Sequence, residues 1–412
     1  MRAVSERGAP RRARAFAVAA LATVIALTGM AAAAEAKPQK TKAVPVKVMT
    51  RNLFLGADLS PALNSTGFES FIEANGAILR EVDLTDFPRR ARGLAGEIAA
   101  TKPDLVGLQE VAHWRTGPVA VPPAVSGNPP TALTTEYDFL QMLLAELDAR
   151  GLSYRAAVVK EEFDFEAPAD ENNVDNDAPP GPFNDDPSTN DESPNSLDDA
   201  ELNGRLTMRD VILVNEDSKV KAKVSKPQTG SFQNLYRPTV SGIEIPVTRG
   251  FTAADVTVKK GKGRKLVKKT FRFVNSHFEA FDDETQRPSI RAQQAQELLN
   301  GPAKGTGKAK TVILLGDFNS DVPGVQPGDE QAYQTLLDGG FSERSLDQPI
   351  SCCVSNLFTA PASEFDHQVD HVMTNASNKK VKLVNSQVTG LDQVNGIYNS
   401  DHAGVFSKLK LR

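Results

Sequence analysis

Length, composition and charge describe an ordinary globular protein. The chain has 412 residues, of which 40% are hydrophobic and 24% charged, and a net charge of −5. These values are typical of a folded chain and exclude one dominated by low-complexity or single-charge sequence. The length exceeds that of one small domain, but a large α/β enzyme could hold it as one unit.

The first 36 residues have the features of a signal peptide. Several Arg side chains precede an apolar run at residues 15–29, and a small-residue A-x-A pattern follows at 34–36. We therefore expect cleavage near Ala36 and a secreted protein. The alternative is a membrane anchor, but the apolar run is short for a span of about 20 residues. No later segment is apolar enough, so we expect no transmembrane segment in the mature chain.

The first part of the mature chain alternates strands and helices. Hydrophobic runs predict strands, and apolar side chains three or four residues apart predict helices. Asp86 is a suitable N-cap for one helix, and Gly151 is a suitable stop for the next. The expected elements are a strand at 44–54, a helix at 86–104, a buried strand at 103–111, a loop at 116–131, a helix at 136–151 and a strand at 152–159.

Residues 161–201 form an acidic segment. They contain 15 Asp and Glu, no Lys or Arg, and many Pro, Asn and Ser. This composition cannot build a core, so we expect a mobile, disordered surface insert. Calcium binding is the alternative, although the segment has no EF-hand spacing. The mature chain outside this insert has a net charge of +7, which could attract a phosphate-bearing substrate.

Strands predominate in the second half. A hairpin with eight basic residues between 259 and 272 could meet phosphates, but a solvated hairpin tip is the favoured interpretation. Mixed helices and hairpins indicate sheets that are not purely parallel. The expected elements are a strand at 206–215, the hairpin at 253–278, a helix at 285–301, a strand at 311–319, and later strands at 365–374 and 382–390.

The two cysteines, Cys352 and Cys353, are adjacent. An exported protein could oxidise them, yet neighbouring Cα atoms about 3.8 Å apart are closer than usual for a disulfide. A vicinal disulfide and a free pair both stay open. Neither cysteine has partners at zinc-ligand spacing, so the sequence predicts no metal site there.

Polar side chains recur where predicted strands end. Three of the five His lie in these clusters. Strand ends are where α/β enzymes gather their sites. The chain has no G-x-S-x-G, G-x-x-x-x-G-K-[ST] or H-E-x-x-H motif, and acidic oxygen ligands favour a hard cation: Mg²⁺, with Mn²⁺ or Ca²⁺ possible. The clusters contain Asn52, Gln109, Glu110, Asn275, His277, Asp317, Asn319, Asp370, His371, Asp401 and His402.

In this order, these clusters resemble the motifs of the endonuclease/exonuclease/phosphatase superfamily, which includes DNase I-like enzymes. The resemblance rests on Asn52 and on "LQE" at 108–110, "NSH" at 275–277, "GDFN" at 316–319, "VDH" at 369–371 and "SDH" at 400–402. It covers residues 44–410, which we expect to form one domain. It implies an α/β fold, a four-layer sandwich of two mixed β-sheets flanked by helices.

The resemblance also implies a metal site. Glu110 is expected to be the principal metal ligand, with Asn52 beside it and Asp401 near the metal. Gln109 is expected to support Glu110 rather than to touch substrate. The bound metal would neutralise phosphate oxygens during hydrolysis.

The remaining motif residues are implied to be catalytic. Asp317 is expected to orient or deprotonate the attacking water, and Asn319 to hold that water or the phosphate. His277 is expected to stabilise the phosphate or to act as an acid. His402 is expected to do the same while hydrogen-bonded to Asp370.

For several polar residues near these motifs, the sequence favours or allows a structural role. His371 has the opposite strand parity from the catalytic Asp370, and Asp321 lies beyond its motif, where it could cap the turn. For Arg205 and Arg209, a phosphate contact and a structural ion pair stay equally open. Gly316 is expected to allow close approach of backbone and ligand at the strand end.

Taken together, the leader and the resemblance favour a secreted, metal-dependent phosphodiesterase acting on a phosphate-ester substrate, with nucleic acid favoured. We expect a monomer. The alternatives are a phospholipase C- or sphingomyelinase-type hydrolase or a phosphomonoester phosphatase. The hairpin tip has no aromatic residue, which argues against deep membrane binding. A catalytically silent binding module is a third possibility, against which the complete set of motifs argues.

Overall fold

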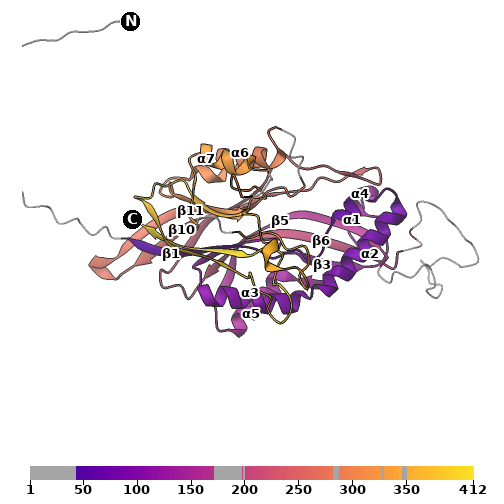
Figure 1. Cartoon of the computed structure of the whole chain (residues 1–412), viewed down its shortest axis with the longest axis horizontal. Coiled ribbons are helices and arrows are strands. Elements are labelled where there is room, and N and C mark those ends of the chain that lie inside the picture. The colour runs from indigo at the N-terminus through magenta and orange to yellow at the C-terminus, as the bar shows by residue number, and fades with distance from the viewer. Residues whose placement is uncertain (1–42, 171–196, 198–199, 282–286, 326–328, 346–349) are drawn as a thin grey trace, which may run out of the picture. The chain divides into compact units, whose positions relative to one another are not determined.

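The computed structural model describes residues 43–170, 197, 200–281, 287–325, 329–345 and 350–412 (Figure 1). These residues fall within the unit Lys42–Arg412. The signal peptide predicted for residues 1–36 lies outside them. Among the described residues, no helix combines the length and apolarity needed to cross a bilayer.

An eight-stranded sheet joins the two ends of the unit. Strand β1 pairs antiparallel with β16 and parallel with β2, so the sheet is mixed. The chain order along the sheet is β15 (Val381–Thr389), β16 (Gly404–Leu411), β1 (Val44–Asn52), β2 (Leu105–Gln109), β6 (Leu202–Asn215), β3 (His113–Gly117) and β4 (Thr134–Asp138), and β5 (Tyr154–Ala169) also pairs with β6.

A second, six-stranded sheet contains the predicted hairpin. Its parallel pair is β11 with β12, and its other neighbours are antiparallel. The order is β13 (Ser342–Glu343), β14 (Asp370–Thr374), β12 (Val312–Asp317), β11 (Val267–His277), β10 (Gly250–Lys260) and β7 (Lys223–Ser231). A small separate sheet pairs β8 (Thr239–Val240) with β9 (Ile243–Glu244).

The two large sheets pack face to face. Alternation along β1 sends Val46 and Val48 into the interface, where they join one core cluster with Phe273 of β11 and Leu315 of β12. Met49 points to the opposite face of the same strand and belongs to a different cluster. A mixed sheet can therefore bury both faces, one against the other sheet and one against helices.

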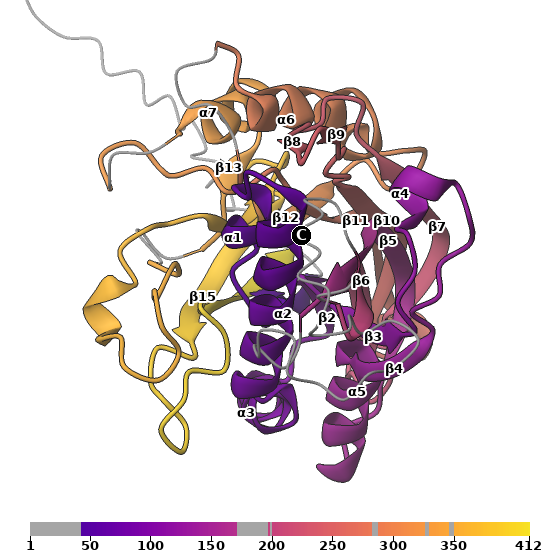
Figure 2. The ribbon, with the colours of Figure 1, turned by 90° about the vertical axis from the view of Figure 1, so that its right-hand side faces the viewer.

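Helices cover the outer faces of both sheets. The helices α2 (Phe68–Leu84), α3 (Phe87–Thr101) and α5 (Phe139–Ala149) pack on the eight-stranded sheet. The helices α6 (Ile290–Asn300) and α7 (Gln331–Asp338) pack on the six-stranded sheet. Figures 1 and 2 show α6 and α7 on the opposite side of the sheets from α3 and α5. This arrangement confirms the predicted four-layer sandwich.

The short helical segments lie in connections. These are α1 (Ser60–Leu63), α4 (Pro123–Ser126), and the 3₁₀ segments Gly263–Lys265, Pro302–Lys304 and Ala362–Glu364. The predicted cap of α3 is confirmed, because the Asp86 carboxylate accepts a hydrogen bond from the backbone N–H of Arg89. The helix predicted from residue 136 begins instead at Phe139, because Tyr137 pairs with Trp114 in strand β4. Helix α2 was not predicted.

Strand β5 corrects the predicted boundary of the acidic insert. Residues 161–169 are not a mobile segment, since β5 continues to Ala169, which pairs with Leu202. Phe165 packs edge-on against Phe71, and the Glu166 carboxylate accepts from the Asn203 amide at 2.8 Å. The rest of the predicted insert, apart from residues 170, 197, 200 and 201, lies outside the described residues.

The basic hairpin tip is remote from the other end of its strands. Gly250 pairs with His277 at one end of the hairpin, and Lys260 pairs with Val267 at the other. Eleven residues of β11 span roughly 35 Å at about 3.3 Å per residue. Side chains at the tip therefore cannot reach groups beside His277, which agrees with the predicted solvated tip.

Gly316 is required by the neighbouring strand. Its φ is +153°, and an added Cβ would lie 1.9 Å from the carbonyl oxygen of Ser276. The close approach is thus between strands β11 and β12, not between backbone and ligand as predicted. We expect Gly316→Ala to lower the free energy of unfolding by about 2–4 kcal/mol, measured by urea denaturation.

The matched control for this substitution is Gly96→Ala. Gly96 lies in α3, and an added Cβ there meets nothing within 4 Å. Because Ala is the better helix former, this change should raise the free energy of unfolding by up to about 1 kcal/mol. Equal stability of the two variants would contradict the steric explanation.

Candidate active site

The carboxyl ends of two parallel strand pairs bring the predicted site residues together. In the eight-stranded sheet, Asn52 at the end of β1 pairs with Gln109, directly before Glu110. In the six-stranded sheet, His277 at the end of β11 pairs with Asp317 at the end of β12, and Asp317 pairs with Asp370. The two sheets thus contribute facing halves of one polar site at a single edge.

Asn52 links the two halves. Its Nδ2 donates to Glu110 Oε1 at 3.1 Å and to Asp317 Oδ2 at 2.9 Å. Its Oδ1 accepts from the backbone N–H of Phe54 at 2.8 Å. Asn52 therefore orients two carboxylates in this structure, and metal ligation through the second lone pair of its oxygen stays a prediction.

Glu110 follows the last residue of β2 in an unusual conformation. Its φ is +53°, which is uncommon for a residue with a side chain and is often found at functional positions. Its Oε2 accepts from the backbone N–H of Leu55 at 2.8 Å. Burial, and then the charge of Asp401, raises the pKa of Glu110. A turned backbone and a fixed carboxylate together aim Glu110 toward Asp401.

Asp317 lies at the centre of the site. It is 1% exposed, and its Oδ1 accepts from the backbone N–H of Asn319 at 3.0 Å. Its Oδ2 lies 3.5 Å from Nε2 of His277 and 3.6 Å from Nε2 of His402. Burial raises the pKa of Asp317 to about 6. A carboxylate with this pKa can accept a proton from water near neutral pH.

His402 is held as a cation by its surroundings. Its Nδ1 lies 2.9 Å from Asp370 Oδ2, as predicted, and the same oxygen accepts from the Ser351 hydroxyl at 2.8 Å. Burial alone would lower the pKa of His402, but the carboxylates of Asp370, Asp317 and Asp401 raise it well above its usual value. Its Nε2–H therefore faces the site as a charged donor.

His277 has the opposite character. Burial, followed by the charge of Arg249, holds its pKa well below the usual value. Arg249 lies 3.2 Å from His277 Nδ1, and a guanidinium can only donate, so Nδ1 accepts and the ring proton sits on Nε2. Nε2 lies 3.1 Å from Asn319 Nδ2, which donates to the Phe278 carbonyl; with the ring proton on Nε2, both nitrogens are donors and share no hydrogen bond, and Asp317 Oδ2 is the acceptor near Nε2, at 3.5 Å. The site therefore combines one neutral and one cationic imidazole.

The donor set fits a hard divalent cation. Glu110 and Asp401 offer partly exposed carboxylate oxygens, and burial raises the pKa of Asp401. Two neighbouring carboxylates with raised pKa values would both be relieved by a cation between them. Oxygen-only donors favour Mg²⁺, Mn²⁺ or Ca²⁺ over zinc. A second group with ligand atoms within 4.8 Å of one another is Asp317, Asp370 and His402.

Other polar residues of the predicted clusters have structural contacts. Gln109 Nε2 donates to Asn275 Oδ1 at 2.5 Å, so it joins the two sheets rather than supporting Glu110 as predicted. Both Asn275 and Gln109 are fully buried. His371 contacts Glu343 Oε2 and the Ser320 carbonyl, which agrees with its structural interpretation.

Arg205 and Arg209, for which the sequence leaves a phosphate contact and an ion pair equally open, also make structural contacts. Arg209 donates to the carbonyls of Val111 and Ala112 and to the Asp138 carboxylate, and Arg205 pairs with Asp164. For both arginines the structure therefore shows the ion-pair alternative. Asp321 accepts from His367 and from the Gln368 backbone, so its role is structural, but it joins two loops rather than capping its own turn as predicted.

Sequence reasoning missed a buried charged network behind His277. Besides His277, Arg249 pairs with Glu279, which is 0% exposed. In the strand β6, burial raises the pKa of Asp210 to about 8. Burial likewise raises the pKa of Glu162, whose side chain lies 3.5 Å from Lys160. The sequence feature that could indicate this network is Asp210, a charged residue next to the apolar run of β6.

A cavity of about 480 Å³ opens beside the polar centre. Glu110, Asp401 and Arg249 contribute to its lining, and Arg249 is the one basic residue among the described residues that line it. Its other walls are mainly apolar and aromatic, and include Phe54, Leu55, Leu59, Phe163, Met208, Phe281, Leu357 and Phe358. This cavity can therefore take a group attached to a phosphate that is bound at the centre.

Several solved structures resemble this chain at low sequence identity. A solved endonuclease/exonuclease/phosphatase family protein from Bacteroides thetaiotaomicron is 16% identical, with a TM-score of 0.49, over 90% of this chain and 96% of that chain. One from Leptotrichia buccalis is 15% identical, with a TM-score of 0.47, over 88% and 99%. A mannosyl-6-phosphatase from B. thetaiotaomicron is 16% identical, with a TM-score of 0.46, over 88% and 99%.

A search of the curated proteins finds no significant match. The model of the Endonuclease/Exonuclease/phosphatase family matches residues 74–402, which is most of the chain and includes Glu110 through His402. Members of this family are phosphoesterase hydrolases. The chain therefore belongs to the endonuclease/exonuclease/phosphatase family.

Proposed function

We propose that the protein is a secreted, divalent-metal-dependent phosphodiesterase. The observation that carries this proposal is the convergence of Asp317 with two imidazoles, whose pKa values are shifted in opposite directions. Asp317 Oδ2 lies 3.5 Å from His277 Nε2 and 3.6 Å from His402 Nε2. A proton acceptor beside a neutral donor and a charged donor suits attack of water on a phosphate ester.

Each side chain has a role in this reaction that follows from its contacts. Asp317, held by Asn52 and the Asn319 backbone, takes a proton from the attacking water. His402 donates from Nε2 to the phosphate or the leaving oxygen, while Asp370 fixes its tautomer. His277 directs Nε2–H at a phosphate oxygen. A divalent cation at Glu110 and Asp401 would supply further neutralisation of the phosphate charge.

Nucleic acid is the substrate class favoured by the sequence. Nucleases bind the phosphate backbone with rows of basic side chains. The basic hairpin tip is remote from His277, and within the described part of the chain one basic side chain, Arg249, lines the cavity beside the site. Its apolar and aromatic walls favour a second candidate, a phospholipase C-type hydrolase whose substrate carries an apolar group next to one phosphate.

The test is hydrolysis of bis-(p-nitrophenyl) phosphate by the purified mature chain. We expect turnover that EDTA removes and that Mg²⁺ or Mn²⁺ restores, because Glu110 and Asp401 offer oxygen ligands. Absence of metal-dependent turnover would indicate a silent binding module. Plasmid DNA, RNA, sphingomyelin and p-nitrophenyl phosphate as parallel substrates would distinguish nuclease, phospholipase and phosphatase.

Secretion is proposed from the leader sequence and is tested separately. The full-length chain, expressed in a bacterium with a general secretory pathway, should be recovered from outside the cytoplasm. N-terminal sequencing should then begin at Lys37. Recovery of an intact N-terminus from the membrane fraction would support the anchor instead.

A further inference from the structure

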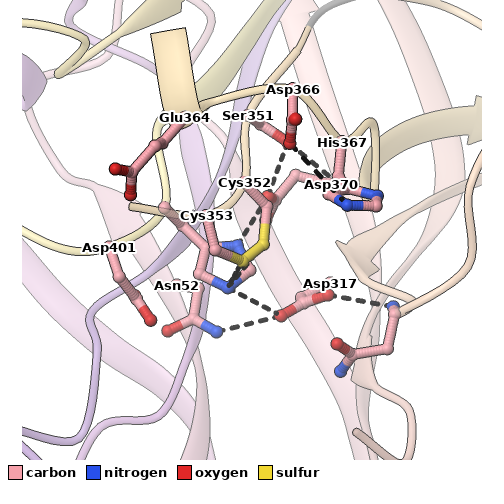
Figure 3. The surroundings of a disulfide bond; sticks show 12 residues. Asn52, Asp317, Ser351, Cys352, Cys353, Glu364, Asp366, His367, Asp370 and Asp401 are labelled. Atoms are coloured by element: carbon pink, nitrogen blue, oxygen red, sulfur yellow. Dashed lines mark hydrogen bonds and ion pairs between the residues drawn. A yellow bond between two sulfur atoms is a disulfide. The ribbon is translucent and has the colours of Figure 1, made fainter. Parts of the chain in front are cut away.

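The segment Ser351–Val354 is fixed against the candidate active site. The Ser351 hydroxyl donates to Asp370, and the Ser351 carbonyl accepts from the Ala403 backbone at 2.6 Å. The Val354 backbone N–H donates to the Asp401 carbonyl at 3.1 Å. Contacts on both sides of the cysteine pair therefore hold it next to the residues of the site (Figure 3).

Both sulfur atoms lie next to one nitrogen of His402. Cys352 and Cys353 form a disulfide, so the vicinal alternative left open by the sequence is the one in the structure. The Sγ atoms lie 3.6 and 3.5 Å from His402 Nε2. This is the nitrogen that faces Asp317, whereas Nδ1 is held by Asp370. The sulfur pair and the proposed reaction therefore share the same atom.

These three atoms have the chemistry and spacing of zinc ligands. Two thiolates and an imidazole are a common donor set for Zn²⁺. With Zn–S of about 2.3 Å and Zn–N of about 2.0 Å, tetrahedral geometry places sulfur and nitrogen about 3.5 Å apart. The possible ligand atoms of Cys352, Cys353 and His402 all lie within 4.8 Å of one another. The observed sulfur–nitrogen distances therefore match a metal site.

Asp370 holds the His402 ring at the nitrogen that does not face the sulfurs. It binds His402 Nδ1 at 2.9 Å, which leaves Nε2 as the atom that faces both sulfurs. A carboxylate on the far nitrogen of a ligating imidazole is the usual support of histidine–zinc bonds. The hydrogen bond between Asp370 and His402 that is proposed to support catalysis would therefore also support metal binding.

We propose that the reduced cysteine pair and His402 form a second metal site, which prefers Zn²⁺ to Mg²⁺ and whose occupation stops hydrolysis. A dithiol or phosphine reductant supplies two electrons, and two protons complete conversion of the disulfide to two thiols. Zn²⁺ then displaces both thiol protons and the Nε2 proton of His402, three protons that pass to solvent, and binds the two thiolates and Nε2, while Nδ1 keeps its proton toward Asp370. Because Nε2 is occupied, His402 no longer donates to the phosphate. The oxidised chain lacks the thiolates and stays active.

The exposure of the two cysteines agrees with a switch between an oxidised, active chain and a reduced, zinc-bound chain. Cys353 is exposed, whereas Cys352 is 5% exposed, so a reductant can attack the outer sulfur. After reduction the sulfurs can separate toward the roughly 3.8 Å of two thiolates on one zinc ion. The sequence predicted no metal site here, because the third ligand is distant along the chain and only the fold brings it close.

The first test is metal binding, which needs no activity. The full mature chain, reduced with tris(2-carboxyethyl)phosphine without oxygen, is titrated with Zn²⁺ and separately with Co²⁺. We expect one ion per chain, bound at least about 100-fold tighter than by the oxidised chain, with a thiolate-to-cobalt absorption band. The double variant Cys352→Ser/Cys353→Ser should lose both. Equal affinity of the oxidised and reduced chains would overturn the proposal.

Histidine variants test the third ligand. His402→Gln should weaken Zn²⁺ binding by about 10–100-fold, whereas His113→Gln, which contacts Thr135 in β4, should leave it unchanged. Equal binding by the His402 variant would show a thiol-only site and overturn the assignment. Stoichiometric Zn²⁺ should also stop turnover of the reduced wild type in excess Mg²⁺ but not of the double serine variant. If no form of the chain hydrolyses phosphate esters, the proposed function fails while the binding result still decides this site.

Discussion

Asp317→Asn is expected to reduce kcat/KM for bis-(p-nitrophenyl) phosphate by about 10²–10⁴-fold, because the amide cannot take the proton of the attacking water. Asn52 Nδ2 and the Asn319 backbone N–H both donate to the present carboxylate. The replacement has nearly the same shape, so the fold should be retained. Asp338→Asn, at an exposed helix end, is the matched control and should keep full activity.

The same substitution should make the protein more stable at pH 7. The pKa of Asp317 is raised from 3.8 to about 6 in the folded state, mainly by burial. The folded chain therefore holds this proton more tightly than the unfolded chain, and stability falls as pH rises from 3.8 to about 6. A neutral amide avoids this loss, but its NH₂ group can no longer accept one of the two hydrogen bonds, so we expect the free energy of unfolding to rise by only about 1–2 kcal/mol.

Urea denaturation at pH 7 and pH 4 measures this effect. The difference between wild type and Asp317→Asn should be large at pH 7 and small at pH 4, where both side chains are neutral. A variant that is inactive and also less stable at pH 7 would indicate a structural role for Asp317 instead of a catalytic one.

Asp370→Asn should have the second large effect, through His402. The carboxylate of Asp370 raises the pKa of His402 and fixes its Nδ1 proton. An amide at this position removes the charge, so the pKa of His402 falls and less of the imidazolium is present at neutral pH. We expect kcat to fall by about 10²–10³-fold. Ser351→Ala removes a hydrogen bond to the same carboxylate but keeps its charge, and should have a much smaller effect.

The pH profile distinguishes this role from a structural one. In the wild type, the rate should fall below pH 6 as Asp317 gains its proton, and fall again as the pH rises through the raised pKa of His402. In Asp370→Asn the alkaline limb should move to lower pH, while the acid limb stays in place. An alkaline limb that does not move would contradict the proposed function of His402.

Local patterns explain what could be predicted from the sequence. Apolar runs that end in Asn52, Glu110, His277 and Asp317 were readable, because a strand's hydrophobic run and its polar end are contiguous. The two-sheet sandwich followed from the family resemblance and is confirmed. The alternation of Phe163 and Phe165 with acids was also readable as a strand. The acidic composition of residues 161–201 argues more strongly for an insert than this short alternation argues for a strand, so the sequence does not predict the end of β5.

Non-local contacts explain what could not be predicted. Arg249 precedes β10 without a motif, and its position behind His277 depends on the pairing of Gly250 with His277. The contact between Cys353 and His402 depends on two loops that approach each other only when β14 and β16 are both in place. Such contacts carry no periodic or spacing signal in one sequence.

The pairing of β1 with β16 has a consequence for synthesis of the chain. Val44 pairs with Leu411, so the first and last strands of the described unit are neighbours in one sheet. Asn52 ends the first strand of this unit, and Asp401 and His402 directly precede its last strand. A ribosome-bound chain therefore has no complete site until β16 has emerged. Hydrolysis should begin only after that point, and truncation of the chain before residue 404 should leave the shorter products inactive.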